Sequence, residues 1–214
     1  MSVFYRYQDS GLDDWNRDNN YLQMGFRPGF AIQARELTQM QTMMQAQITA
    51  MADKFVGNGG LVDVVHSLQG PGGPGQYNLS FTPGYFYIKP REKDLGYMVY
   101  SPNTLTVNNI PNFEGEQARV YLIYEEVQVN SEGQETDSMG GFARISIDPS
   151  LNDNAQGFTN YSAPGASRYQ INILNIGYYI QGEGALPPNG VEVIYFQNNT
   201  PYFSANNTLV PINT

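Results

Sequence analysis

The pattern of hydrophobic and polar residues divides the chain into an N-terminal segment, one helix and a long series of strands. Residues 1–25 mix aromatic and charged side chains without a period of 2 or 3.6. This indicates an extended arm anchored by its aromatics, or else a frayed terminus. Good helix formers follow, Pro28 suits a first helical turn, and a glycine-rich stretch ends the run. We therefore expect one long helix over residues 26–56.

The helix carries a heptad pattern of apolar residues. Its a positions are Ala34, Gln41, Ile48 and Phe55, and its d positions are Leu37, Met44 and Met51; we call these seven residues the seam. Gln41 places an amide inside the seam, and Met40 and Met43 lie outside it, so apolar surface spreads around the helix. Between Glu36 and Asp53 no residue is charged. Because a solvated helix normally carries charges, we expect the seam to pack against protein partners.

Beyond residue 60, short apolar or alternating runs are separated by Gly, Pro and Asn, which predicts an antiparallel β domain over residues 61–214. The expected strands cover residues 61–68, 77–81, 85–89, 97–100, 104–107, 119–129, 143–147, 169–173, 178–180 and 191–196. Residues 131–141 are predicted to form a solvated hairpin loop. The uncharged residues 193–214 are predicted to lie on the protein. The fold class is therefore mainly β, an antiparallel β-sandwich or barrel-like domain with one long N-terminal α-helix and an extended N-terminal arm.

Charge and composition narrow the possible partners. Only 14% of residues are charged, against roughly 25% in an average soluble domain, so the surface is polar through amides and hydroxyls or is covered by partners. The net charge of -9 argues against nucleic acid. The absence of cysteine excludes disulfides and thiolate metal sites. Apolar runs are too short to enter a membrane, and the N-terminus lacks a signal-peptide pattern, so we expect synthesis in a cytosol.

Residues that carry enzyme chemistry are sparse. The one histidine, His66, lies in the run 61–68, on the face of Val62 and Val64 by period 2, and is expected to be a packing residue. Adjacent Glu125 and Glu126 point to opposite faces of a strand, and we interpret them as a solvated strand end. One histidine without cysteine is poor zinc chemistry.

Two further patterns favour structural roles. Acidic and amide residues at 148–154 lack the ordered spacing of a calcium loop, and a turn after the preceding strand is the simpler interpretation. The glycine runs at 57–60 and 70–75 lack the Lys and Ser or Thr that meet a phosphate. We expect no catalytic residue, no cofactor and no metal ion. Surface tyrosines beside Asn and Gln leave a glycan-binding alternative open.

Two segments resemble a known family. They are FRPGFAIQARELTQMQTMMQAQI at residues 26–48 and DPSLNDNAQGFTNYSAPGASRYQI at residues 148–171. Both resemble signature stretches of an uncharacterised domain in virion structural proteins of tailed phages, often T4-like phages of marine cyanobacteria, assigned to the baseplate or tail fibres. FTPGYFYI at residues 81–88 is also similar, and the resemblance covers residues from about 20 to about 180. The chain departs from the family at Ser167, where an acidic residue is usual. It is also shorter than many family members.

The resemblance implies a non-enzymatic structural protein of the phage tail, synthesised in the host bacterial cytoplasm. It implies a tail or baseplate adaptor that attaches fibres or links baseplate subunits, with copies of itself and other tail, baseplate or fibre proteins as partners. The alternatives are a receptor-binding tip that recognises host glycan and an envelope-degrading enzyme, which the sparse chemistry disfavours.

The expected interface residues lie on the helix and at its start. They are Leu37, Met40, Gln41, Met44, Ile48, Met51 and Phe55, with Arg27, Arg35 and Glu36 as charges that fix register or simply solvate the helix end.

Overall fold

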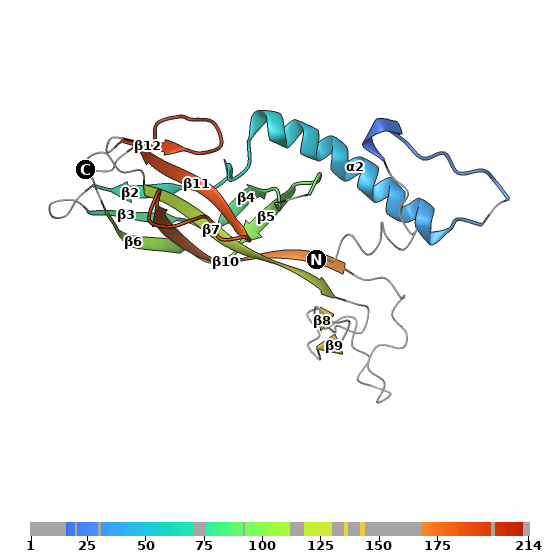
Figure 1. Ribbon diagram of the computed structural model, residues 1–214. Coiled ribbons are helices and arrows are strands. Elements are labelled where there is room, and N and C mark those ends of the chain that lie inside the picture. The colour runs from blue at the N-terminus through green and yellow to red at the C-terminus, as the bar shows by residue number, and fades with distance from the viewer. Residues whose placement is uncertain are drawn as a thin grey trace.

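The protein is mainly β, and the part of the chain that the computed structural model describes has one α-helix ahead of three antiparallel sheets (Figure 1). The structure describes residues 16–19, 21–29, 31–70, 76–91, 93–111, 118–129, 135–136, 142–143, 168–197 and 200–211. The expected fold class is confirmed. Most of the expected N-terminal arm, the predicted strand beyond residue 143, and the acidic and amide cluster at 148–154 lie outside the described residues.

The α-helix, α2 (Ala34–Phe55), follows a 3-10 turn, η1 (Arg17–Asn19). It begins at Ala34 and not at residue 26 as predicted, and Pro28 lies in a turn ahead of it. The start is set by Glu36, whose carboxylate accepts a hydrogen bond from the Gln33 backbone N–H at 2.9 Å. That contact satisfies a donor that the helix itself leaves free. The helix ends before Gly57, which adopts a φ of 78° that favours glycine.

The strands form three sheets in which every pair is antiparallel. The first sheet has the order β1 (Leu61–Val62), β4 (Gly84–Ile88), β5 (Tyr97–Ser101). The second has the order β2 (His66–Gln69), β3 (Gln76–Phe81), β6 (Leu105–Pro111). The third has the order β12 (Thr200–Phe203), β11 (Gly190–Gln197), β7 (Ala118–Val129), β8 (Glu135–Thr136), β9 (Phe142–Ala143), and β10 (Arg168–Ile180) also pairs with β7.

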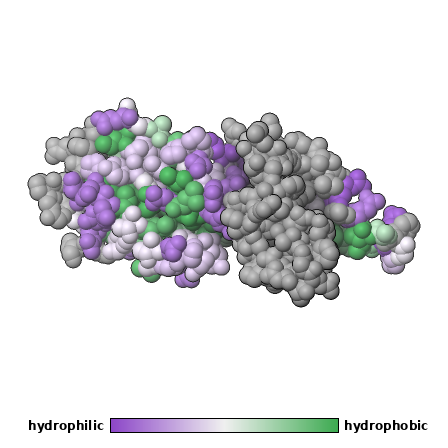
Figure 2. Space-filling model, turned by 90° about the horizontal axis from the view of Figure 1, so that it is seen from below, coloured by the Kyte–Doolittle hydropathy of each residue, from purple (hydrophilic) through white to green (hydrophobic). Residues whose placement is uncertain are grey.

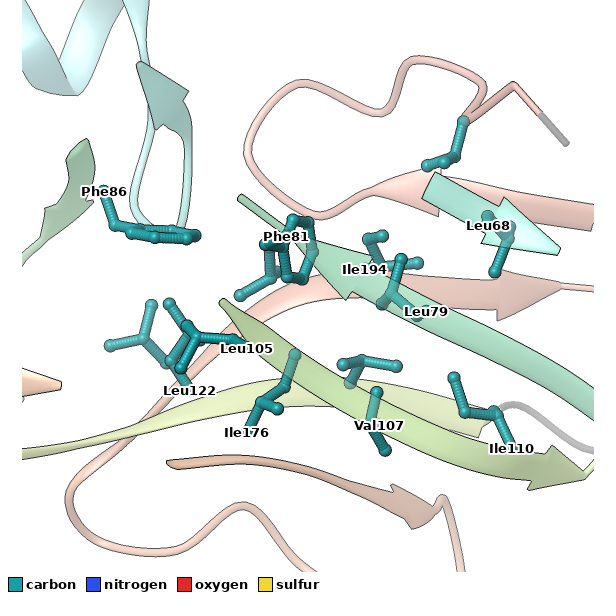
Figure 3. Packing of buried hydrophobic residues seen from close by; sticks show 14 of the residues in the cluster. Leu68, Leu79, Phe81, Phe86, Leu105, Val107, Ile110, Leu122, Ile176 and Ile194 are labelled. Carbon is teal, nitrogen blue, oxygen red and sulfur yellow. The ribbon is translucent and has the colours of Figure 1, made fainter. Parts of the chain in front are cut away.

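One hydrophobic core joins the sheets in a sandwich-like arrangement (Figure 3). Tyr77 of β3 and Phe196 of β11 place their ring centroids 5.1 Å apart, which brings the second sheet onto the third. Phe86 of β4 meets Phe81 of β3 edge to face at 5.8 Å, which brings the first sheet into the same core. Fully burying a side chain of this kind contributes roughly 1.5–3 kcal/mol.

Several expected strands differ from those observed. The predicted strand 61–68 is two strands, because Asp63 adopts a φ of 57° and the chain leaves the first sheet to enter the second at His66. The two strands predicted within residues 169–180 are one, β10, with a bulge between Ile173 and Asn175. The predicted solvated loop 131–141 contains β8. The prediction that the uncharged C-terminal residues lie on the protein is confirmed for the described part, where β12 pairs with β11.

Candidate functional site: the exposed face of the helix

The C-terminal half of α2 is attached to the first sheet by hydrogen bonds to Gly96, which precedes β5. The buried Thr49 hydroxyl donates to the Gly96 carbonyl oxygen at 3.2 Å and accepts from the Gly96 N–H at 3.0 Å. Gln45 donates from its side-chain amide to the same carbonyl. The helix is therefore held at one backbone position by polar side chains.

A second attachment joins Asp53 of the helix to strand β4. The Tyr87 hydroxyl donates to one carboxylate oxygen of Asp53 at 2.7 Å, and the Lys89 ammonium lies 2.6 Å from the other. Burial, reinforced by Asp53, raises the pKa of the Tyr87 hydroxyl, so this group keeps its proton and remains a donor. The Tyr87 ring lies directly against Gly96, where an added Cβ would meet ring atoms at 2.4 and 2.6 Å. Only glycine fits there without movement.

The seam lies on the exposed part of the helix. Its five large apolar residues keep between 44% and 81% of their surface exposed: Leu37, Met44, Ile48, Met51 and Phe55. Gln41 is exposed as well, whereas Met40 is half-buried and Met43 is buried. The structure therefore brings the predicted a and d residues from Leu37 to Phe55 together on one surface and leaves Met40 at its margin.

The buried part of α2 has a different composition from the seam. It consists of Gln39, Thr42, Met43, Thr49 and Ala52, of which only Met43 is a large apolar residue. With 3.6 residues per turn, the residues that meet the first sheet, Thr49 and Asp53, lie largely on the opposite side of the helix from Met44 and Phe55. Surface helices usually turn their apolar stripe toward their own core, whereas the seam's large apolar residues are exposed in the described part of this chain.

The segment before the helix adds to the same surface. Gln47 donates from its side-chain amide to the Leu22 carbonyl oxygen at 3.2 Å, so this segment folds back along the helix (Figure 1). Its large apolar residues are also exposed: Tyr21, Leu22, Phe26 and Ile32. Figure 2 shows a small hydrophobic patch among hydrophilic residues at the right-hand end of the view.

The three charges predicted at the helix start do not share one environment. Arg27 lies before the helix and not in its first turn, which corrects the predicted position, and its side chain is exposed. Arg35 is in the first turn and is exposed. Glu36 caps the helix through Gln33, so its observed contact is structural.

The histidine considered for chemistry has a packing role. His66 opens β2 and meets the Phe203 ring edge to face at 5.1 Å, and burial lowers its pKa. The break at Asp63 means that no single strand runs from Val62 to His66, although Val62, Val64 and His66 are all half-buried while Asp63 and Val65 are exposed.

Glu126 was predicted to be part of a solvated strand end, and the structure corrects this prediction. It forms an ion pair with Lys93, whose side chain is only 7% exposed. Burial lowers the pKa of the Lys93 ammonium, and Glu126 opposes that shift. Sequence patterns missed this pair because it joins a loop after β4 to β7, far apart in the chain.

Tyrosines on the third sheet bear on the glycan alternative. Tyr195 and Tyr202 stack with ring centroids 5.3 Å apart and an interplanar angle of 18°, and the Arg119 guanidinium lies 5.9 Å from the Tyr195 centroid. Arg119 also pairs with Glu192 at 2.7 Å, and Tyr179 donates to Glu192 at 2.5 Å. Burial, with Glu192, raises the pKa of Tyr179 to about 12. These rings lie against protein groups, which leaves less of their faces for a sugar.

Comparisons of the chain with protein-family models, with curated proteins and with solved structures found no match. Among the described residues, no group of three or more His, Cys, Asp or Glu is arranged to hold a metal ion. No helix in that part of the chain combines the length and apolar character that a membrane span requires.

Proposed function

We propose that this chain is a non-enzymatic structural protein of a tailed-phage virion. In this proposal it is a tail or baseplate adaptor that attaches tail fibres or links baseplate subunits, and it is synthesised in the host bacterial cytoplasm. The observation that carries the proposal is the exposed seam of α2, in which Met44, Met51 and Phe55 are all more than half exposed.

The size of the exposed seam supports a role in assembly. The exposed parts of its five large apolar residues amount to about three whole side chains, or roughly 600 Å² at about 200 Å² each. A patch of this size lies at the upper end of what a typical monomer exposes, roughly 300–600 Å². Covering it would contribute about 15 kcal/mol at ~25 cal/mol per Å², before the costs of association. That is enough to drive a lasting contact.

The phage part of the proposal is supported by the resemblance of residues 26–48. This segment contains the turn at Pro28, the capping residues Gln33 and Glu36, and five of the seven seam residues. The motif therefore coincides with the part of the molecule that orients and begins the exposed face. A signature stretch in this position is what a conserved attachment element requires.

Incorporation into virus particles tests the proposal. A phage lacking this gene is supplied in trans with the wild-type chain, with a Met44→Glu/Met51→Glu double variant, or with Ala50→Glu, whose exposed site lies off the seam. Immunoblots of purified particles measure the chain. We expect wild type and Ala50→Glu in particles and at least a tenfold loss for the double variant, because charge is excluded from interface cores.

Circular dichroism of the purified variants controls for folding, since all three substituted side chains are exposed in the single chain. Normal incorporation of the double variant, or absence of the wild-type chain from particles, would refute the adaptor role. Binding of the purified wild-type chain to host cells or host polysaccharide would instead favour the receptor-binding alternative.

A further inference from the structure

The distribution of charge shows what kind of partner the seam accepts. The chain carries a net charge of -9, yet the helix from Leu37 to Ala52 has no charged residue. Copies with an excess of negative charge repel each other unless they meet at an uncharged surface. A basic partner would be recognised by acidic side chains around the seam, and the flanking positions hold none: they are Thr38, Met40, Gln45, Gln47, Ala52 and Lys54. An identical chain fits this surface.

Gln41 decides how two identical helices would be oriented. Its side-chain amide carries both donors and an acceptor, so two Gln41 side chains can satisfy each other. They meet across the axis only if the helices are parallel and in register. If two helices paired antiparallel with Leu37 opposite Phe55, Gln41 would lie opposite Met51, and the amide would be buried against an apolar side chain. Burying an amide without a hydrogen bond is costly, so the parallel arrangement is favoured.

The position of the β domain is compatible with parallel helices. The contacts of Thr49 and Asp53 with the first sheet lie largely opposite the seam, so each β domain would sit outside the helix pair. The seams of two copies would together cover roughly 1,200 Å², the lower end of stable interfaces. Leu22 and Phe26, held beside the helix through Gln47, add exposed apolar surface at its flank.

We propose that the seam is covered by a second copy of this chain, with the α2 helices parallel and in register and their Gln41 side chains hydrogen-bonded across the axis. This rests on the proposed function only in treating the seam as a protein interface. It adds the identity of the partner and the direction in which it binds.

Variants with one introduced cysteine test the relative direction of the two helices, because the wild-type chain has no cysteine. Leu37 and Phe55 are the first and last large apolar residues of the seam, about 27 Å apart along the helix at ~1.5 Å per residue. A disulfide needs Cα atoms within about 7 Å. If the helices are parallel, the Leu37→Cys variant by itself forms a disulfide-linked dimer, and so does the Phe55→Cys variant by itself. A mixture of the two variants then forms no disulfide between Cys at position 37 and Cys at position 55. Antiparallel copies give the reverse result. Ala50→Cys, exposed but off the seam, controls for random collisions.

Light scattering of the purified wild-type chain tests the association itself. We expect the mass of two or more chains, and the mass of one chain for Met44→Glu/Met51→Glu. Gln41→Leu should still associate but lose its preferred direction, so that mixed Leu37→Cys and Phe55→Cys disulfides appear in that background. A wild-type mass of one chain at every concentration from micromolar to millimolar, or cross-links only in the mixture, would overturn the proposal.

The results separate this proposal from the adaptor role. If the wild-type chain is monomeric but enters particles in a seam-dependent way, another virion protein covers the seam and only the self-association fails. If the chain associates in parallel but does not occur in particles, the self-association stands and the adaptor role fails.

Discussion

Gly96 is the position where a small change should most directly test how the helix is held. A Cβ at Gly96 would lie 2.1 Å from the Tyr87 hydroxyl oxygen and 2.4 and 2.6 Å from ring atoms. Tyr87 is fully buried and its hydroxyl is hydrogen-bonded to Asp53, so the ring cannot move away without breaking that contact. Overpacking of this kind costs about 1–3 kcal/mol. The two hydrogen bonds between the Thr49 hydroxyl and the Gly96 backbone, worth about 1 kcal/mol each, are also displaced.

We therefore expect Gly96→Ala to lower the free energy of unfolding by about 2 kcal/mol or more, even though Gly→Ala at a compatible site stabilises by roughly 0.4–1 kcal/mol. For a chain of this length that corresponds to a fall in Tm of about 4–8 °C in calorimetry. Hydrogen exchange should rise along the second half of α2, because the helix loses its attachment. Gly25→Ala is the control, since an added Cβ there meets nothing within 4 Å. A Tm for Gly96→Ala equal to that of the control would contradict this account of helix docking.

Two further predictions concern titratable groups in the β domain. Glu126→Gln removes the negative charge beside the nearly buried Lys93 and should lower the free energy of unfolding by about 3 kcal/mol. Urea titration measures this change. A change below about 0.5 kcal/mol would show that the ion pair does not stabilise the fold. Because burial lowers the pKa of Lys93, stability should rise as the pH increases from the folded pKa toward 10.5. Burial also lowers the pKa of His66, so the unfolded state binds more protons and stability should fall as the pH drops below 6.5 toward the folded pKa. His66→Gln should flatten that part of the stability profile, and an unchanged slope would place its cause elsewhere.

Hydrogen bonds hold α2 against the first sheet. Thr49 and Gln45 anchor the helix through hydrogen bonds to one backbone position, and this leaves the seam free. Hydrogen bonds fix direction better than apolar packing does, because their geometry is narrow. A helix held in this way can present an apolar surface to a partner in a defined direction without first collapsing onto its own core.

Local patterns in the sequence determined the fold class, the presence and end of the long helix, and several strands. Period 2 located the strands at 77–81, 119–129 and 191–196 to within a residue or two, because each has alternating neighbours on a half-buried surface. The heptad positions of the seam could also be read locally, because helical periodicity depends only on spacing. These features need no knowledge of distant residues.

Only the tertiary structure decided the features that depend on distant residues. The helix start is a local exception: Glu36 caps the Gln33 N–H three residues away, although Pro28 offered an equally reasonable start. The break at Asp63 exists because the chain changes sheets there. The direction of the seam was likewise undetermined, because a helix with an apolar stripe can turn it inward or outward. That choice is made by Thr49 and Asp53 meeting strands far along the chain, and it leaves the seam available to a partner.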